Sequence, residues 1–224
     1  MKAELVKLPQ CVLFDLDGTL LDSIPGIAWS VKAALVAAGL PEPSVDLRQS
    51  IGPPIRTILS RAAATEDSAL LDELERHFRA SYDTEGWRRT ACFPGTRELL
   101  EAMKANGHRL FIISNKPRHI SSKILEALGL ISYFEQLYTR DSVKPPYASK
   151  ANMLEALLGD HQLAAVDCVM VGDTMEDADA SALQRIGFIF MEHGYGELSL
   201  AHPVLLRLGS FSALMPYLAL ENVQ

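Results

Sequence analysis

The sequence predicts an α/β protein built on a parallel sheet, with a helical domain inserted after its first strand. Three observations favour this fold. Short apolar runs alternate with amphipathic helical patterns from about residue 96 onward, a single apolar run at residues 11–14 precedes them, and the segment between has helical periodicity only. Alternating strands and helices are typical of parallel sheets with right-handed crossovers.

Five apolar runs have the length of strands rather than of helices. These predicted strands are residues 11–14, 110–113, 137–138, 168–171 and 187–190. Helical patterns alternate with them at residues 96–105, 118–128, 149–158 and 175–184. A last apolar stretch, residues 211–220, carries Pro216 inside a helical pattern. It is too short to span a membrane, so we expect it to pack on the core.

Residues 23–89 are predicted to form the inserted helical domain, and residues 1–22 and 90–224 the α/β core. Apolar residues of the insert recur at helical spacing, as at Ile27, Val31 and Leu35, and again at Leu74, Phe78 and Tyr82. The chain returns to the core at residues 93–95, where proline and glycine break the helical pattern. We therefore expect the insert to cap the carboxyl end of the first strand.

Composition limits the possible partners. The formal net charge of −7 over 224 residues, with no basic block that could neutralise a polyanion, argues against nucleic-acid binding. The first ten residues lack the continuous apolar stretch of a signal peptide or membrane anchor. Cys11, Cys92 and Cys168 have no metal-ligand spacing, so we expect buried free thiols. These features predict a cytoplasmic protein with no membrane or nucleic-acid partner.

The first predicted strand ends in an acidic turn, Asp15-Leu16-Asp17-Gly18-Thr19. Asp15 falls at the carboxyl end of the strand, which is the edge where open α/β sheets bind ligands. Gly18 allows a tight turn or a close approach that a side chain would block. Two carboxylates this close repel each other unless a cation or a shared proton relieves the repulsion. A hard divalent ion such as Mg²⁺ would do so.

Polar residues also follow two later strands. Ser114-Asn115-Lys116 precedes a predicted helix, so a hydroxyl and unpaired backbone N–H groups could bind an anion there. Alternatively, Ser114 caps the helix and Lys116 is a solvated charge. Asp173 opens the acidic run 173–177 after the strand at 168–171. An acid-rich helix start, favoured by the helix dipole, is the alternative interpretation of that run.

Residues 15–23, Asp-Leu-Asp-Gly-Thr-Leu-Leu-Asp-Ser, resemble the first motif of the haloacid dehalogenase-like hydrolases. Most members of that family are Mg²⁺-dependent phosphatases that work through an aspartyl-phosphate. Ser114 matches the second motif, and Gly-Asp-x-x-x-Asp at residues 172–177 matches the fourth. The resemblance covers the whole chain. It implies a Rossmann-like core with an α-helical cap of the C1 type, and a phosphomonoesterase most similar to the phosphoglycolate phosphatase group.

The resemblance also implies roles for the motif residues. Asp15 would be the nucleophile and Asp17 the general acid and base. Mg²⁺ would be bound by Asp15, Asp173 and the backbone carbonyl of Asp17, with Asp177 supporting them through hydrogen bonds. Ser114 would bind the phosphoryl group. Further substrate contacts are assigned to Gly18, Thr19 and Asn115.

Two lysines compete for the cation that faces the phosphoryl group. Lys144 precedes two prolines and resembles the Lys-Pro form of the family's third motif. Lys150 opens a predicted helix, and the segment Lys-Ala-x-x-Leu that it begins resembles another branch. The spacing to the fourth motif favours Lys150. The other lysine would then be solvated, as most lysines are.

The expected substrate is a small phosphate ester, phosphoglycolate-like or a sugar phosphate. A phosphosugar mutase of the β-phosphoglucomutase type is an alternative, but Thr19 stands where those mutases usually have valine. A non-catalytic phosphate-binding protein is the alternative from another class. Arg56 follows a rigid Gly-Pro-Pro turn and could bind an anionic substrate tail, or it could be a solvated arginine. We expect a monomer or homodimer.

A loop and the histidines are less informative. Residues 194–196, Gly-Tyr-Gly, resemble a loop of phosphoglycolate phosphatase-like members, and a flexible turn is an equally good interpretation. The six histidines form no ligand spacing. They are predicted to be surface or hydrogen-bonded histidines without a catalytic role.

Overall fold

The structure, a computed structural model, describes residues 8–43 and 54–218. It divides into two compact units: a core unit, Met1–Leu20 with Cys92–Gln224, and a helical unit, Leu21–Ala91. The predicted insert, residues 23–89, begins two residues after the helical unit begins and ends two residues before the unit ends. That the helical unit acts as a cap stays a prediction.

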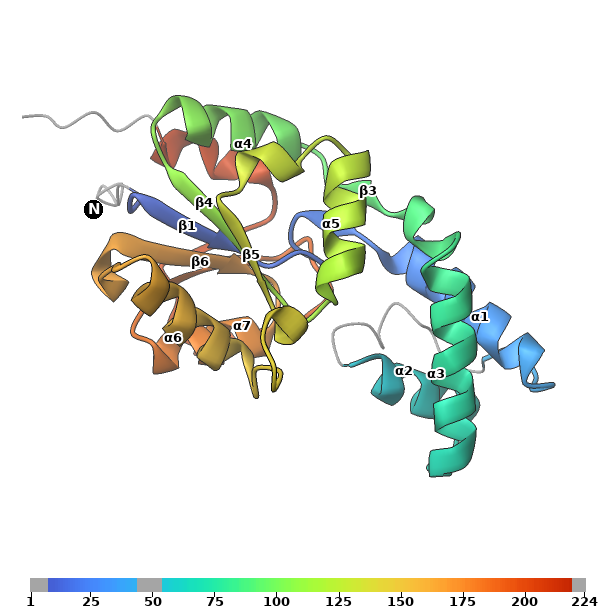
Figure 1. Cartoon of the computed structure of the whole chain (residues 1–224). Coiled ribbons are helices and arrows are strands. Elements are labelled where there is room, and N and C mark those ends of the chain that lie inside the picture. Colours follow the sequence, from blue (N-terminus) through green and yellow to red (C-terminus); the bar gives the residue numbers. More distant parts are fainter. Residues whose placement is uncertain (1–7, 44–53, 219–224) are drawn as a thin grey trace, which may run out of the picture. The chain divides into compact units, whose positions relative to one another are not determined.

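One parallel sheet forms the centre of the core unit (Figure 1). Its strand order is β5-β4-β1-β6-β7-β8, so the sheet grows from β1 first in one direction and then in the other. In open α/β sheets, ligands bind at the carboxyl ends of the strands where this direction changes, which is here beside β1. The strands are β1 (Cys11–Phe14), β4 (Arg109–Ser114), β5 (Gln136–Thr139), β6 (Cys168–Gly172), β7 (Gly187–Met191) and β8 (Leu206–Leu208).

The register of the central strands brings their polar ends to one level. Phe14, the last residue of β1, pairs with Ile112 in β4 and with Val171 in β6. All four residues of β1 are buried, as expected for a parallel strand covered on both faces. Residues that follow β1, β4 and β6 therefore meet at one edge of the sheet.

Helices cover both faces of the sheet. Helices α6 and α7 lie on one face, and α4 and α5 on the other (Figure 1). Met153 and Leu157 of α6 pack against Leu13 and Phe111 in the strands, which gives a continuous apolar core. The bounds are α4 (Thr96–Ala105), α5 (Arg118–Ala127), α6 (Lys150–Asp160) and α7 (Met175–Leu183). These helices and the five longer strands lie where the sequence predicts them.

Three short strands and the last apolar segment differ from the prediction. Strand β8 is not predicted, and neither is the two-stranded pair of β2 (Leu21–Asp22) and β3 (Ala91–Cys92). Residues 211–218 form two 3₁₀ segments, Phe211–Ala213 and Met215–Tyr217, instead of one helix. Pro216 lacks the backbone N–H that a continuous helix would use. Phe211 is fully buried, so the segment packs on the core as expected.

The described part of the helical unit consists of α1 (Ile24–Ala37), α2 (Ile55–Ala63), α3 (Ser68–Tyr82) and a 3₁₀ segment, Gly86–Arg89. Helix α1 approaches the 3₁₀ segment closely, because a Cβ at Gly26 would lie 2.2 Å from the carbonyl oxygen of Gly86. The predicted apolar faces are buried between α1 and α3, at Val31, Leu35, Leu74 and Phe78. None of the helices in residues 8–43 and 54–218 has both the length and the apolar composition needed to cross a bilayer.

Candidate active site

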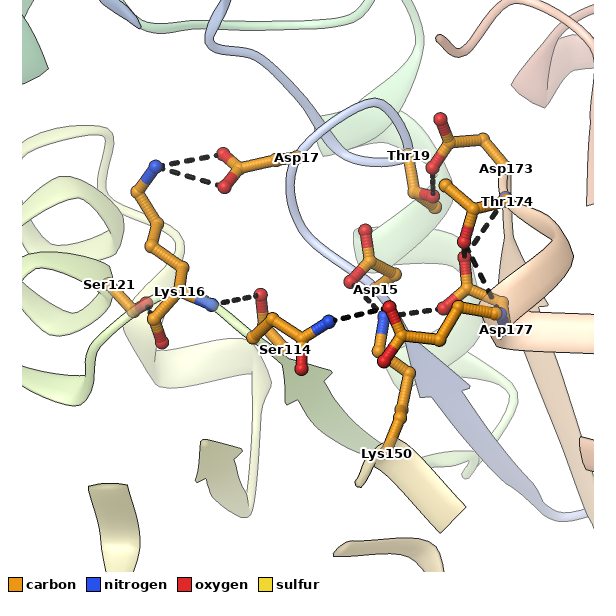
Figure 2. A network of polar contacts seen from close by, with 12 residues as sticks. Asp15, Asp17, Thr19, Ser114, Lys116, Ser121, Lys150, Asp173, Thr174 and Asp177 are labelled. Carbon is orange, nitrogen blue, oxygen red and sulfur yellow. Dashed lines mark hydrogen bonds and ion pairs between the residues drawn. The ribbon is translucent and has the colours of Figure 1, made fainter. Parts of the chain in front are cut away.

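Asp15 stands at the carboxyl end of β1. Its backbone N–H donates to the carbonyl oxygen of Val171 at 3.0 Å, which extends the sheet pairing one residue beyond Phe14. The residue is 5% exposed. Its Oδ1 accepts a hydrogen bond from Lys150 Nζ at 2.8 Å (Figure 2). A buried carboxylate with an ionic partner is held in one orientation, as a reacting group must be.

Lys150 is the first residue of α6, and its side chain is almost fully buried. Its Nζ donates to Asp15 and also to Asp177 Oδ1, at 2.5 Å. Burial alone would lower the pKa of Lys150, but the charges of the two carboxylates and their hydrogen bonds raise that pKa above its ordinary value. Lys150 is therefore an ammonium that links β1 to α7.

The start of α7 orients Asp177. Thr174 is the N-cap residue, and its hydroxyl accepts from the backbone N–H of Asp177. In return, Asp177 Oδ2 accepts from the N–H of Thr174 at 3.0 Å and from its hydroxyl at 2.6 Å. This capping box fixes the carboxylate whose other oxygen binds Lys150. The acid-rich start of α7 is thus a helix cap and an ion-pair partner at once.

Three buried carboxylates gather at this edge of the sheet. Ligand oxygens of Asp15, Asp173 and Asp177 lie within 4.8 Å of one another. Burial raises the pKa of Asp15 well above its ordinary value; the charges of Asp177 and Asp173 raise it further, and the charge of Lys150 opposes the increase. One ammonium cannot neutralise three carboxylates, and all the donors are hard oxygens. The cluster therefore fits Mg²⁺.

Asp173 follows β6 and accepts hydrogen bonds on both oxygens. Oδ1 accepts from the hydroxyl of Thr19 at 2.9 Å. Oδ2 accepts from the backbone N–H groups of Tyr195 at 2.7 Å and Gly196 at 3.4 Å. Burial and the nearby charge of Asp177 raise the pKa of Asp173 to about 6, although these hydrogen bonds oppose the increase. The loop at residues 194–196 therefore orients Asp173.

Glycines surround Asp173 because a side chain would not fit. A Cβ at Gly18 would lie 2.2 Å from Asp173 Oδ2, and a Cβ at Gly194 would lie 2.2 Å from Asp173 Cβ. At Gly196, a Cβ would lie 2.3 Å from the carbonyl oxygen of the same aspartate. Gly18 also has a positive φ of 94°. Of the two interpretations of the Gly-Tyr-Gly loop, packing against this aspartate explains its glycines directly, and a flexible turn does not.

The Asp17 side chain points away from this cluster (Figure 2). Both of its oxygens accept from Lys116 Nζ, each at 3.0 Å. The Lys116 side chain is only 5% exposed. Ser114, at the end of β4, is also buried, and its hydroxyl oxygen accepts from the backbone N–H of Lys116 at 3.2 Å. Ser114 and Lys116 thus lie at the same strand edge as the acidic turn.

Asn115 connects two loops of the core unit. Its amide nitrogen donates to Glu176 Oε2 at 2.9 Å. Its carbonyl oxygen is buried without a hydrogen-bond partner. A buried oxygen of this kind is costly to leave unpaired, so Asn115 has an acceptor available for a ligand. This oxygen can accept from a hydroxyl of a ligand but not from a phosphoryl oxygen, which has no proton to donate. The contact between Asn115 and substrate stays a prediction.

Two residues that the sequence offered as candidates, Lys144 and Arg56, have other surroundings. Lys144 is exposed, and its predicted competitor Lys150 is the lysine that contacts Asp15. Arg56 belongs to the helical unit, where its guanidinium donates to Asp72 Oδ1 at 2.6 Å and to Glu75 Oε1 at 2.9 Å. These ion pairs join α2 to α3. The Gly-Pro part of the turn predicted before Arg56 lies outside the described residues.

Two contributors to the site have little or no signal in the sequence. Lys116 could be read as solvated because its partner Asp17 lies 99 positions away. Its place two residues after a buried strand, level with the acidic turn, was a usable signal. The backbone donors of residues 195 and 196 carry no side-chain signature. Only the glycines on either side of Tyr195 mark them.

Comparison with known proteins gives relatives over most of the chain. The tyrosine-protein kinase PtkA of Mycobacterium tuberculosis is 35% identical over 189 residues, which cover 84% of this chain and 64% of that protein. This chain thus spans just under two thirds of the length of PtkA. The solved structure of PtkA matches with a TM-score of 0.81 at 32% identity and covers 95% of this chain and 99% of the solved chain.

Two other relatives align over most of their own length. A phosphoglycolate phosphatase of Yersinia pseudotuberculosis is 33% identical, with 95% of this chain and 94% of that protein covered. A 5′-nucleotidase of Pseudomonas aeruginosa is 32% identical, with 83% of each covered. The family model described as haloacid dehalogenase-like hydrolase matches residues 12–191. This chain therefore belongs to the haloacid dehalogenase-like hydrolases.

Proposed function

We propose that this chain hydrolyses a small phosphate monoester through an aspartyl-phosphate on Asp15. The observation that carries the proposal is the buried Asp15 carboxylate, placed at the end of the central strand with one oxygen on Lys150. The family, and relatives named phosphoglycolate phosphatase and 5′-nucleotidase, support a phosphatase activity. The proposed substrate is phosphoglycolate-like or a sugar phosphate.

In the first step, Asp15 Oδ2 attacks phosphorus, because Oδ1 is bound to Lys150. The new bond joins Asp15 to phosphorus, and the ester P–O bond breaks. Asp17 must enter this step as the protonated acid; the leaving oxygen takes its proton and departs as an alcohol. Lys150 stays beside the transferred group and balances its negative charge.

In the second step, a water molecule attacks the phosphorus of the aspartyl-phosphate. Asp17, now a carboxylate, takes the proton of that water. The bond between Asp15 and phosphorus breaks, inorganic phosphate leaves, and Asp15 is regenerated. Division into two displacements, each with a positioned acid or base, avoids direct attack of water on the ester.

The remaining residues bind and orient. Asp15, Asp173 and the backbone carbonyl of Asp17 would hold Mg²⁺, and Asp177 would keep Lys150 in place. Bound there, the ion supplies positive charge to the phosphoryl oxygens. The Ser114 hydroxyl, with the backbone N–H groups of Gly18, Thr19 and Asn115, would donate to the same oxygens. Three free thiols suit a reducing compartment, so we also propose a cytoplasmic location.

A second candidate is transfer of the phosphoryl group to an acceptor other than water. It is favoured by the 35% identity with a protein named tyrosine-protein kinase. A phosphosugar mutase would likewise return the group to a sugar hydroxyl. A kinase and a mutase both transfer an activated phosphoryl group, as the proposed phosphatase does. They differ from it in the acceptor, which is a hydroxyl of another molecule or of a sugar and not water. The products therefore decide between them.

The test is a screen of phosphorylated metabolites and p-nitrophenyl phosphate, with and without Mg²⁺, with released phosphate as the readout. Wild-type protein is expected to release phosphate, and folded Asp15→Asn protein is expected to release none, since an amide is a poor nucleophile. Mass spectrometry of acid-quenched protein should find phosphate on Asp15. Retained activity in Asp15→Asn would refute the covalent mechanism. Phosphorylated acceptor without released phosphate would favour transfer.

A further inference from the structure

Lys116 and Asp17 form an ion pair that the proposed chemistry does not by itself require. Lys116 Nζ lies 3.0 Å from each oxygen of the Asp17 carboxylate. The lysine side chain is 5% exposed and the aspartate side chain 23% exposed. Burial of an ammonium is costly unless a carboxylate compensates for the lost hydration. The pair is therefore built into the fold and is not a surface contact.

The backbone around Lys116 is fixed on both sides. Its N–H donates to the Ser114 hydroxyl at 3.2 Å, and its carbonyl oxygen accepts from the Ser121 hydroxyl at 3.4 Å. Pro117, the N-cap residue of α5, follows directly. The ammonium thus projects from a rigid junction between β4 and α5. A rigid support of this kind can set the orientation of the side chain that it binds.

We propose that Lys116 is the positioning residue of Asp17, the acid and base of the reaction. The inference rests on the proposed function. An ammonium has three N–H donors, and a carboxyl group has two oxygens. Lys116 stays hydrogen-bonded to one oxygen of Asp17, and the other oxygen faces the reacting atoms. In the first step that second oxygen carries the proton and donates it to the leaving oxygen. In the second step it accepts a proton from water. Without Lys116, the Asp17 side chain loses this fixed orientation.

A role through Asp17 has a kinetic signature that a merely structural role lacks. Protonation of the leaving oxygen matters most for basic leaving groups and little for p-nitrophenolate, which departs readily unprotonated. The value of kcat/KM reports the steps up to formation of the aspartyl-phosphate. For a series of aryl phosphates, the loss of kcat/KM should therefore grow with the basicity of the leaving phenol.

The experiment measures kcat/KM for aryl phosphates from p-nitrophenyl to p-methoxyphenyl in wild type, Lys116→Met, Asp17→Asn and the double variant. Lys116→Met is expected to lose about 10²-fold with the most basic phenol and about threefold or less with p-nitrophenol. In the Asp17→Asn background, Lys116→Met should cause no further loss, because both changes remove the same contribution. Lys116→Arg, which keeps the charge and can bind a carboxylate with two N–H groups, should restore most of the activity.

Lys104→Met is the matched control, because Lys104 is an exposed lysine of α4. It should leave the whole series unchanged. If Lys116→Met does not fold, Lys116→Gln replaces it, with the same expectations. An equal loss across the series, or a loss that persists in the Asp17→Asn background, would refute the positioning role and indicate direct contact of Lys116 with the phosphoryl group. A wild-type chain without turnover would refute the proposed function itself, and the inference with it.

Discussion

Lys150 Nζ lies 2.8 Å from Asp15 Oδ1, although the two residues are 135 positions apart in the sequence. The lysine also holds Asp177, so a single ammonium joins the end of β1 to the start of α7. Loss of Lys150 would leave the buried carboxylates of Asp15 and Asp177 without this shared cation. Substitution of Lys150 therefore affects both charge balance and geometry at the proposed nucleophile.

We expect Lys150→Ala to lower kcat by about 10²-fold or more, because it removes a preorganised charge beside the transferring group. Lys144→Ala is the matched control, since Lys144 is exposed, and it should change kcat little. Steady-state kinetics on both variants, with circular dichroism to verify folding, makes the comparison. A large loss in Lys144→Ala alone would reverse the assignment of the active-site lysine.

Gly194→Ala should weaken Mg²⁺ binding about 10-fold or more by displacing Asp173. The new Cβ would lie 2.2 Å from the Cβ of that aspartate. Gly194 does not have a positive φ, so the effect is steric and not conformational. Titration calorimetry with Mg²⁺ measures it directly. Gly159→Ala is the control: nothing lies within 4 Å of its added Cβ, so Mg²⁺ affinity should stay the same.

Mg²⁺ should raise the melting temperature more at pH 7.5 than at pH 5. In the folded protein without metal, Asp173 has a pKa of about 6, against an ordinary value of 3.8. Between these values the folded state binds more protons than the unfolded state, so the free energy of unfolding falls as the pH rises. Above the folded pKa, the cost of the buried charge is fully present and a cation relieves it. Equal shifts at both pH values would contradict this account, and Asp173→Asn should reduce the shift at pH 7.5.

Arg56→Ala separates two roles for an arginine of the helical unit. The ion pairs with Asp72 and Glu75 predict a lower melting temperature and no discrimination between substrates. The measurement compares kcat/KM for the best screened substrate and for p-nitrophenyl phosphate. Arg61→Ala, an exposed position in the same helix, is the control. A loss confined to the screened substrate would instead support the sequence-based prediction that Arg56 binds a substrate tail.

The strands and helices of the core were predictable because their patterns are local. Cys11–Phe14 is an uninterrupted apolar run between polar residues, and the structure has β1 with those same bounds. Strand β8 has only three residues, with Arg207 in the middle, and so gives no such signal. Pro216 lies in an apolar segment that resembles a helix, but the proline favours two short 3₁₀ segments there.

The partners of the site residues were harder to predict than the residues themselves. Asp15 and Asp173 are recognisable from their places after buried strands. The pairing of Asp17 with Lys116 is a contact between two loops, and no periodicity encodes it. The place of Lys116 two residues after β4 predicts that it lies at the carboxyl edge of the sheet. Only side-chain geometry distinguishes it from an ordinary solvated lysine.

The central position of β1 has a consequence for synthesis of the chain on the ribosome. Cys11 pairs with Arg109 on one side and with Cys168 on the other, so β1 emerges long before either neighbouring strand. At about 5–20 residues per second, the four apolar residues of β1 stay unpaired for several seconds. The helical unit is complete in that interval, whereas the nascent strand needs protection from aggregation. Because the Asp15 N–H bonds to Val171, the nucleophile reaches its final position only after about three quarters of the chain has been made.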